Sequence, residues 1–109
     1  MKTEKQIQND IMREFATRSD LRLWRANTGV ARFGRRIVRF GVPGQADLTG
    51  ILNDGRRLEI EVKSATGRQD NDQQRFEAMI KKFGGIYILA RSVDNVLHKL
   101  KTAGYIAEQ

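Results

Sequence analysis

The spacing of hydrophobic residues along the chain predicts three amphipathic helices. Apolar side chains recur three and four positions apart in each of them, which places these side chains on one helical face. We expect that face to pack against the core in every case. The apolar positions are Ile7, Ile11, Met12 and Phe15 in a helix over residues 4–17; Phe76, Met79, Ile80 and Phe83 in a second; and Val93, Val96, Leu97 and Leu100 in a third.

Polar residues at the predicted helix starts support these assignments. Thr3 is followed three positions later by Gln6, and Asp70 by Gln73, which is the spacing of a capping box. Ser92 is expected to cap the third helix.

The remaining apolar segments predict strands. Asp54-Gly55 is a strong hairpin turn signal between two of them, and a predicted helix precedes the last strand, which makes it parallel to its neighbour. We therefore expect an α/β fold, a mixed β-sheet flanked by helices in the order αβββαβα, and a single domain over residues 1–109. The strand segments are 21–26, 46–52, 57–63 and 86–90, with a short hairpin of unspecified register around Gly34-Arg35 within 27–44.

The strand at 57–63 carries charge on one face. Alternation directs Glu59, Glu61 and Lys63 to one side and the intervening apolar residues into the core. The neighbouring strand can bring Asp47 beside Glu61, and two carboxylates with an ammonium group form a site for a hard cation. The alternative is a solvated strand face, because Glu-x-Lys is common by chance and antiparallel sheets often keep one polar face in water.

The composition excludes several kinds of site. Cysteine is absent, so disulfides and thiolate metal sites are impossible. His98, the only histidine, is expected at the surface or in the last turn of a helix, without a catalytic role. No apolar run approaches the length of a membrane span or a signal-peptide core. We expect an intracellular protein, in the cytoplasm of a bacterium or of a phage-infected cell.

Positive charge is concentrated in one segment. The formal net charge is +7, which favours a polyanionic partner, nucleic acid ahead of membrane. Between positions 21 and 46 there are six arginines, interleaved with aromatic residues and glycines, and no acidic residue. Arginine suits phosphate recognition because its planar fork donates two hydrogen bonds. A solvated basic face is the alternative.

Together these motifs resemble the PD-(D/E)xK nuclease superfamily with its restriction-endonuclease-like core, and within it the VRR-NUC branch in its stand-alone phage and bacterial form. One departure is Ala46, which stands where the superfamily name has proline, although Pro43-Gly44 is similar to the VRR-NUC pattern. The resemblance extends over nearly the whole chain through Glu4, Trp24 to Gly29, Gly41 to Gly50, Glu61 to Ser64, Gly67-Arg68, Gln73, Phe76 and Gly84-Gly85.

The resemblance implies a metal site. Asp47, Glu61 and the main-chain carbonyl of Val62 would bind Mg²⁺ or Mn²⁺, which prefer oxygen ligands. Glu4 would reach the ion through water or hold a second one; its other interpretation is favourable charge at a helix N-terminus.

It also implies roles for side chains that do not bind the metal. Lys63 would position or help deprotonate the attacking water, and Gln73 would orient the lysine or the scissile phosphate, with Gln74 as the neighbouring candidate. Glu59 is expected either to be solvated or to contact the metal-binding residues without binding the metal itself.

The arginine-rich segment supplies the predicted DNA contacts, made to phosphates rather than to bases. Thr28 and Gly29 would allow close backbone approach, Trp24 is expected in the core, and Phe33 and Phe40 would insert into DNA or be buried at a dimer interface. The contact residues are Arg25, Asn27, Arg32, Arg35, Arg36 and Arg39.

The expected function is a Mg²⁺- or Mn²⁺-dependent endonuclease that hydrolyses DNA phosphodiesters, with branched DNA as substrate in the manner of a Holliday-junction resolvase and a homodimer as the family's assembly. The alternatives are a nuclease acting on flaps or other DNA structures, a DNA-binding module of the same fold without catalysis, and an RNA- or single-strand-binding domain.

Overall fold

The computed structural model describes residues 1–26 and 29–107, and within them three helices and six strands. Asn27 and Thr28, for which contacts were predicted, lie outside the described residues. The elements in chain order are α1 (Glu4–Phe15), β1 (Leu21–Arg25), β2 (Gly29–Phe33), β3 (Arg36–Phe40), β4 (Leu48–Leu52), β5 (Arg57–Val62), α2 (Asn71–Lys82), β6 (Ile86–Ala90) and α3 (Val93–Thr102).

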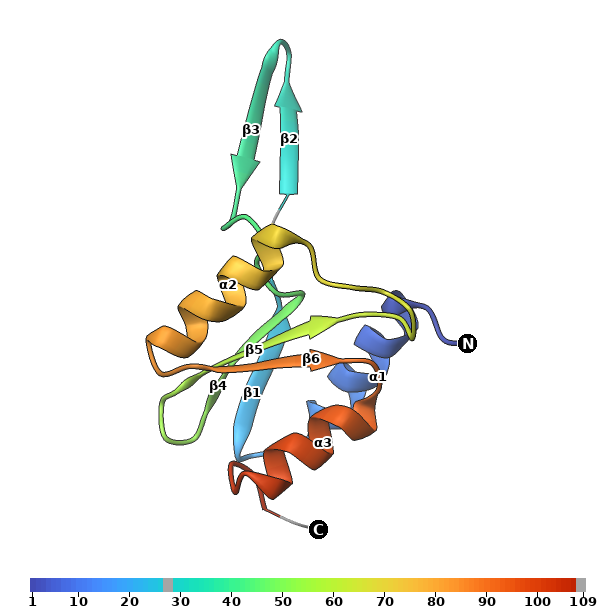
Figure 1. Ribbon diagram of the computed structural model, residues 1–109, viewed down its shortest axis with the longest axis vertical. Coiled ribbons are helices and arrows are strands. Elements are labelled where there is room, and N and C mark those ends of the chain that lie inside the picture. The colour runs from blue at the N-terminus through green and yellow to red at the C-terminus, as the bar shows by residue number, and fades with distance from the viewer. Residues whose placement is uncertain (27–28, 108–109) are drawn as a thin grey trace.

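The main sheet has the strand order β1-β4-β5-β6 (Figure 1). β4 pairs antiparallel with β1 and with β5, and β5 pairs parallel with β6. The sheet is therefore mixed, and its strands and the three helices follow the predicted order. The predicted hairpin is also present: β2 and β3 form a separate two-stranded sheet.

The predicted caps are present. Thr3 with Gln6 and Asp70 with Gln73 form reciprocal capping boxes, and Ser92 Oγ accepts a hydrogen bond from the Asn95 N–H. No helix in the two described ranges is long and apolar enough to cross a membrane.

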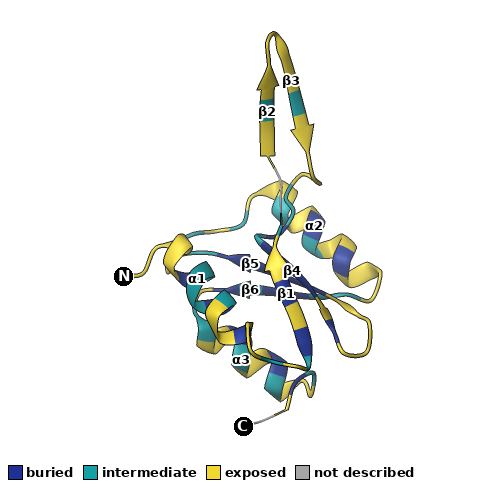
Figure 2. Cartoon of the chain, turned by 180° about the vertical axis from the view of Figure 1, so that it is seen from behind, coloured by how far each residue is buried: buried dark blue, intermediate teal, exposed yellow. Residues whose placement is uncertain are grey.

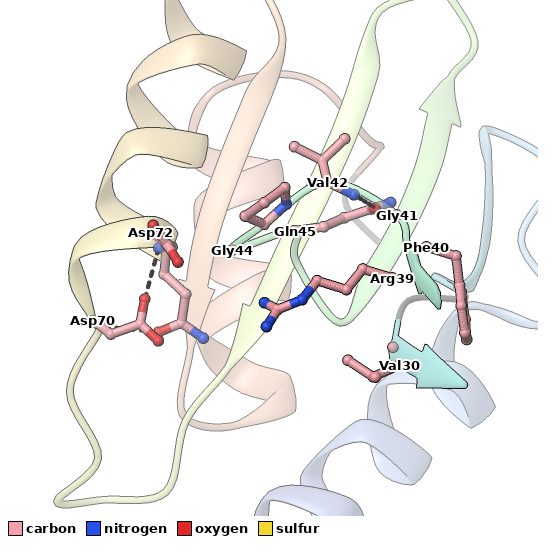
Figure 3. Close-up of a pocket in the computed structure, with 12 residues that line it drawn as sticks. Val30, Arg39, Phe40, Gly41, Val42, Gly44, Gln45, Asp70 and Asp72 are labelled. Carbon is pink, nitrogen blue, oxygen red and sulfur yellow. Dashed lines mark hydrogen bonds between the residues drawn. The ribbon is translucent and has the colours of Figure 1, made fainter. Parts of the chain in front are cut away.

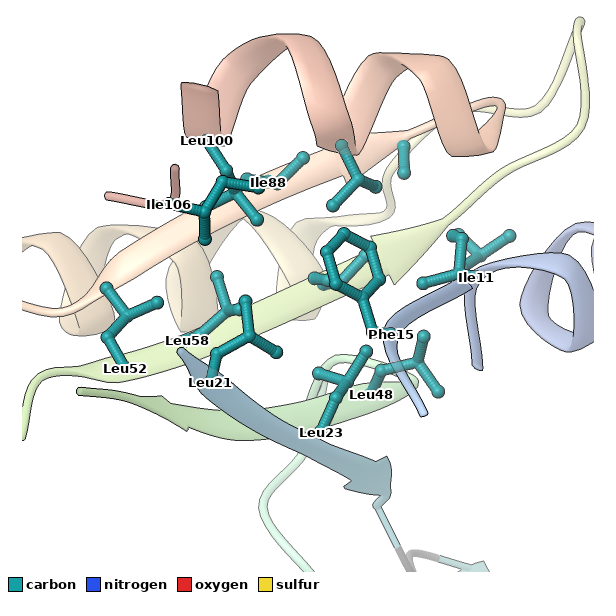
Figure 4. Packing of buried hydrophobic residues seen from close by; sticks show 14 of the residues in the cluster. Ile11, Phe15, Leu21, Leu23, Leu48, Leu52, Leu58, Ile88, Leu100 and Ile106 are labelled. Atoms are coloured by element: carbon teal, nitrogen blue, oxygen red, sulfur yellow. The ribbon is translucent and has the colours of Figure 1, made fainter. Parts of the chain in front are cut away.

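The main core lies between the sheet and the pair α1 and α3 (Figure 4). Leu58, Ile60 and Val62 of β5 face this side and are buried, as the alternation predicted. Ile11 and Phe15 of α1 and Leu100 of α3 cover them.

α2 covers the opposite face of the sheet, over its β6 edge (Figures 1 and 2). Its buried apolar residues are Phe76 and Ile80, which join a small cluster with Ala46 and Tyr87. The prediction that Met79 and Phe83 belong to the inner face was wrong, because both are exposed. The contact of α2 is mainly with one edge strand, so only a narrow stripe of the helix is covered.

Trp24 also differs from its prediction. Its side chain is 47% exposed rather than in the core. Alternation along β1 puts Leu21 and Leu23 on the buried face and Trp24 on the other, together with Arg22. That face of β1 is left open because α2 lies over β6 at the far edge of the sheet.

Candidate functional site

Asp47 and Glu61 are brought together by the antiparallel pairing of β4 with β5. Leu48 pairs with Ile60, so the residue before Leu48, Asp47, lies opposite the residue after Ile60, Glu61. The N–H of Val62 donates a hydrogen bond to Asp47 Oδ2 at 2.8 Å. The carbonyl of Asp47 accepts from the N–H of Ala26 at 2.9 Å. These main-chain bonds fix the Asp47 backbone and side chain at the end of the sheet.

The Glu61 side chain is buried, with only 2% of its surface exposed. Its Oε2 accepts a hydrogen bond from Gln73 Nε2 at 2.9 Å and lies 3.6 Å from Lys63 Nζ. Its Oε1 is buried without a hydrogen-bond partner in the described part of the chain. Because a buried oxygen without a partner is costly, this atom marks a position where a cation or donor would be stabilising. The solvated-face interpretation of Glu-x-Lys is excluded by this burial.

Burial is the main cause that raises the pKa of both carboxyl groups. Burial, followed by the charge of Asp47, raises the pKa of Glu61 to about 8, and Lys63 opposes this shift. The pKa of Asp47 is raised mainly by burial, against the hydrogen bond from Val62. Two carboxylates this close cannot easily both be ionised without a compensating positive charge.

Gln73 is positioned by the start of α2. Its Oε1 accepts a hydrogen bond from the Asp70 N–H at 3.0 Å, which completes the capping box, while its Nε2 reaches Glu61. Of the two glutamines considered from the sequence, the structure brings Gln73 to the acidic pair; Gln74 is exposed.

Glu4 lies beside the loop that follows β5. Its Oε2 accepts a hydrogen bond from the Ser64 N–H at 3.4 Å, and its charge contributes to the raised pKa of Asp47. Within residues 1–26 and 29–107 no three His, Cys, Asp or Glu side chains are close enough together to hold a metal ion. The carboxylates that could contribute metal ligands at this point are therefore those of Asp47 and Glu61.

Arg91 holds the same loop and was not singled out from the sequence. Its Nη1 donates to the carbonyls of Ser64 and of Gly67, at 2.5 and 2.8 Å. These contacts span 27 and 24 positions in sequence, so no local pattern could have indicated them. Arg91 thereby fixes the backbone directly after Lys63.

A cavity of about 350 Å³ opens beside Gln73, between the base of the β2–β3 hairpin and the start of α2 (Figure 3). Arg39 extends across it towards the turn that carries Asp70 and Asp72. Gly44 in its wall has a φ of +77°, and a Cβ there would lie 2.2 Å from the main chain of Asp72. The residue has to be glycine for both reasons.

Glu59 is not solvated, contrary to one of its predicted environments. It is fully buried, and its Oε2 accepts hydrogen bonds from Thr49 Oγ1 and, at 3.0 Å, from Arg57 Nε. Alternation correctly placed it on the face of Glu61. Its burial could not be foreseen, because it depends on what covers the sheet.

The predicted DNA-contact arginines fall into two places. Arg25 ends β1 and donates to Asn9 of α1. Arg32, Arg35, Arg36 and Arg39 are exposed on the hairpin and its turn, and none of them pairs with an acidic group among the described residues.

The sequence matches no known protein-family model. It also matches no curated protein. The α/β class with its mixed sheet rests on the structure.

Proposed function

We propose that the chain is a Mg²⁺- or Mn²⁺-dependent structure-specific DNA endonuclease with a PD-(D/E)xK-type core, resembling a Holliday-junction resolvase. The observation that carries the proposal is the pair formed by the half-buried Asp47 and the buried Glu61 beside Lys63, with Glu61 Oε1 lacking a partner among the described residues. A protein that needed only to fold would gain stability from apolar residues at such positions.

The residues fit a divalent ion of the hard, oxygen-binding kind. Asp47, Glu61 and the carbonyl of Val62 would hold it, with Glu4 within reach of the same region through the loop at Ser64. When bound, such an ion supplies charge stabilisation at a phosphoryl oxygen and lowers the pKa of coordinated water. Its positive charge would also oppose the burial and the neighbouring negative charges that raise the pKa of Glu61 and Asp47.

The chain's own residues would do the remaining work. Lys63, whose side chain is 13% exposed, would hold a water molecule and offset charge that builds on phosphorus. Gln73 would keep the Glu61 carboxylate in one orientation through its amide donor. The arginines of the hairpin would hold the DNA backbone next to the cavity at Gln73.

Cleavage of end-labelled DNA tests this proposal. Four-way junction, flap, duplex and single-stranded substrates would be incubated in Mg²⁺, Mn²⁺ or EDTA with the wild type and Lys63→Ala, and with Lys82→Ala as an exposed control at the end of α2. We expect metal-dependent cuts, strongest in the junction, that are lost only in Lys63→Ala. Absence of cleavage together with tight metal-independent junction binding would instead favour a DNA-binding module without catalysis.

A further inference from the structure

The β2–β3 hairpin is an arm that extends away from the main sheet (Figures 1 and 2). An isolated two-stranded hairpin is only marginally stable in water. Yet this one exposes large apolar side chains: Val30, Phe33 and Ile37 are 62, 63 and 59% exposed. Apolar surface concentrated on a projecting arm indicates an interaction surface.

Both faces of the hairpin carry apolar residues together with arginine, in different proportions. Residues directly opposite each other in an antiparallel pair share a face. Val30 pairs with Arg39 and Arg32 with Ile37, so one face carries two arginines and two apolar residues. The other face carries Ala31, Phe33, Arg36, Val38 and Phe40. Each face therefore combines apolar side chains with at least one arginine, so neither face is a purely polar, solvent-facing surface.

Charge selects the partner. Residues 29–45 contain four arginines and no acidic residue. A symmetric contact between the hairpins of two copies would bring these arginines together, and the whole chain carries a net charge of +7. The same arginines that would repel a second copy attract a polyanion, so a polyanion is the favoured partner.

We propose that the hairpin inserts between two arms of a branched DNA, so that each face contacts a different arm. The proposal rests on the proposed function for its DNA partner. A ribbon lying in the groove of one linear duplex would leave one face in water, whereas a branch point covers both. Arginines contact phosphates on each side, and Phe33, next to the turn, packs on bases or sugars that the branch leaves accessible.

The geometry assigns one arm to the site. Val30 and Arg39 line the cavity together with Gln73, whose side chain is hydrogen-bonded to Glu61. DNA on this face continues towards the acidic pair. On the other face Phe40 also lines this cavity at the base of the hairpin, but Phe33 and Arg36, near the turn, do not. The DNA arm that Phe33 and Arg36 contact therefore serves to recognise the branch.

Binding in EDTA tests the proposal without requiring cleavage. Affinity for a four-way junction and for a linear duplex of the same arm sequence would be measured for the wild type, for Phe33→Ala with Arg36→Ala, and for Arg32→Ala with Arg39→Ala. Lys101→Ala, in α3 at the opposite end of the molecule, is the control (Figure 1). Thermal melting verifies that each variant is folded.

We expect the Phe33 and Arg36 variant to lose at least about ten-fold in junction affinity while its duplex affinity stays within about two-fold, because only the junction uses that face. The Arg32 and Arg39 variant should lose affinity for both DNAs.

Equal losses of affinity on both DNAs in the Phe33 and Arg36 variant, or no junction preference in the wild type, would overturn the inference even if cleavage occurs. So would a wild-type dimer that Phe33→Ala dissociates, since a second copy would then cover the hairpin. If the pattern appears without any metal-dependent cleavage, the proposed catalysis fails and the role of the hairpin stands.

Discussion

Gln73 joins the start of α2 to Glu61: its Nε2 donates to Glu61 Oε2 at 2.9 Å, while its Oε1 accepts from the Asp70 N–H at 3.0 Å. A single side chain thus completes a helix cap and holds a carboxylate of the candidate site. A change at Gln73 should therefore affect both stability and activity.

Gln73→Ala is expected to lower stability by about 1 kcal/mol, because the hydrogen bond from the Asp70 N–H to the Gln73 side chain is lost while the one from the Gln73 N–H to Asp70 remains. Cleavage of junction DNA should fall at least ten-fold, or about 1.4 kcal/mol in transition-state stabilisation, because the orientation of Glu61 is released. Denaturant unfolding and steady-state kinetics measure the two effects. Gln74→Ala, at the exposed neighbouring position, is the matched control and should change neither by a comparable amount.

Metal-free stability should decrease as the pH rises. The pKa of Glu61 is raised from 4.5 to about 8 in the folded chain. Between these values the folded state retains a proton that the unfolded state has released. The free energy of unfolding is therefore highest below pH 4.5 as far as this group is concerned, and it falls towards pH 8 by at most about 1.4 kcal/mol per pH unit.

Urea unfolding in EDTA across this pH range measures the slope. Glu61→Gln removes the titrating group and should flatten the profile. An identical slope in Glu61→Gln would show that other groups cause the dependence.

Mn²⁺ should stabilise the wild type against heat. A ligand that binds only the folded state raises the free energy of unfolding by about 2.7 kcal/mol at 100 times its dissociation constant. Asp47→Asn and Glu61→Gln should each lose this stabilisation, whereas Asp72→Asn, which alters an exposed carboxylate of α2, should keep it. A metal-induced rise in Tm that persists in Asp47→Asn would remove that residue from the ligand set.

Gly44→Ala should be far more damaging than Gly34→Ala. Both glycines have positive φ, which costs a non-glycine residue about 1–2 kcal/mol. Only at Gly44 would the added Cβ also collide with the main chain of α2; at Gly34 it meets open space. We expect the loop of Gly44 to be displaced from the start of α2, with a loss of stability of more than about 2 kcal/mol. Equal losses in the two variants would contradict this explanation.

Local patterns in the sequence predicted most of the fold. Helix spacing, capping boxes and the Asp54-Gly55 turn are encoded within a few residues of each other, and the structure confirms the elements they predicted. The same locality explains why Asp47 and Glu61 could be placed side by side: they lie on strands joined by one short turn.

The errors concern which surfaces are covered. Trp24, Met79 and Phe83 were expected inside and are exposed, and Glu59 is fully buried. Each outcome depends on where α2 crosses the sheet, which is decided by tertiary packing rather than by local spacing. The role of Arg91 was missed for a related reason, because its hydrogen-bond partners are distant in sequence.

The short β4–β5 connection also bears on how the molecule folds. Closing a small antiparallel loop is fast and entropically cheap, whereas pairing β5 with β6 requires the whole α2 crossover. Asp47 and Glu61 should therefore be brought together early in folding, while both are still hydrated. They should lose their water only when α2 docks and Gln73 forms its hydrogen bond to Glu61. The late docking step is then the one that is opposed by carboxylate charge, so refolding of the metal-free chain should slow as the pH rises.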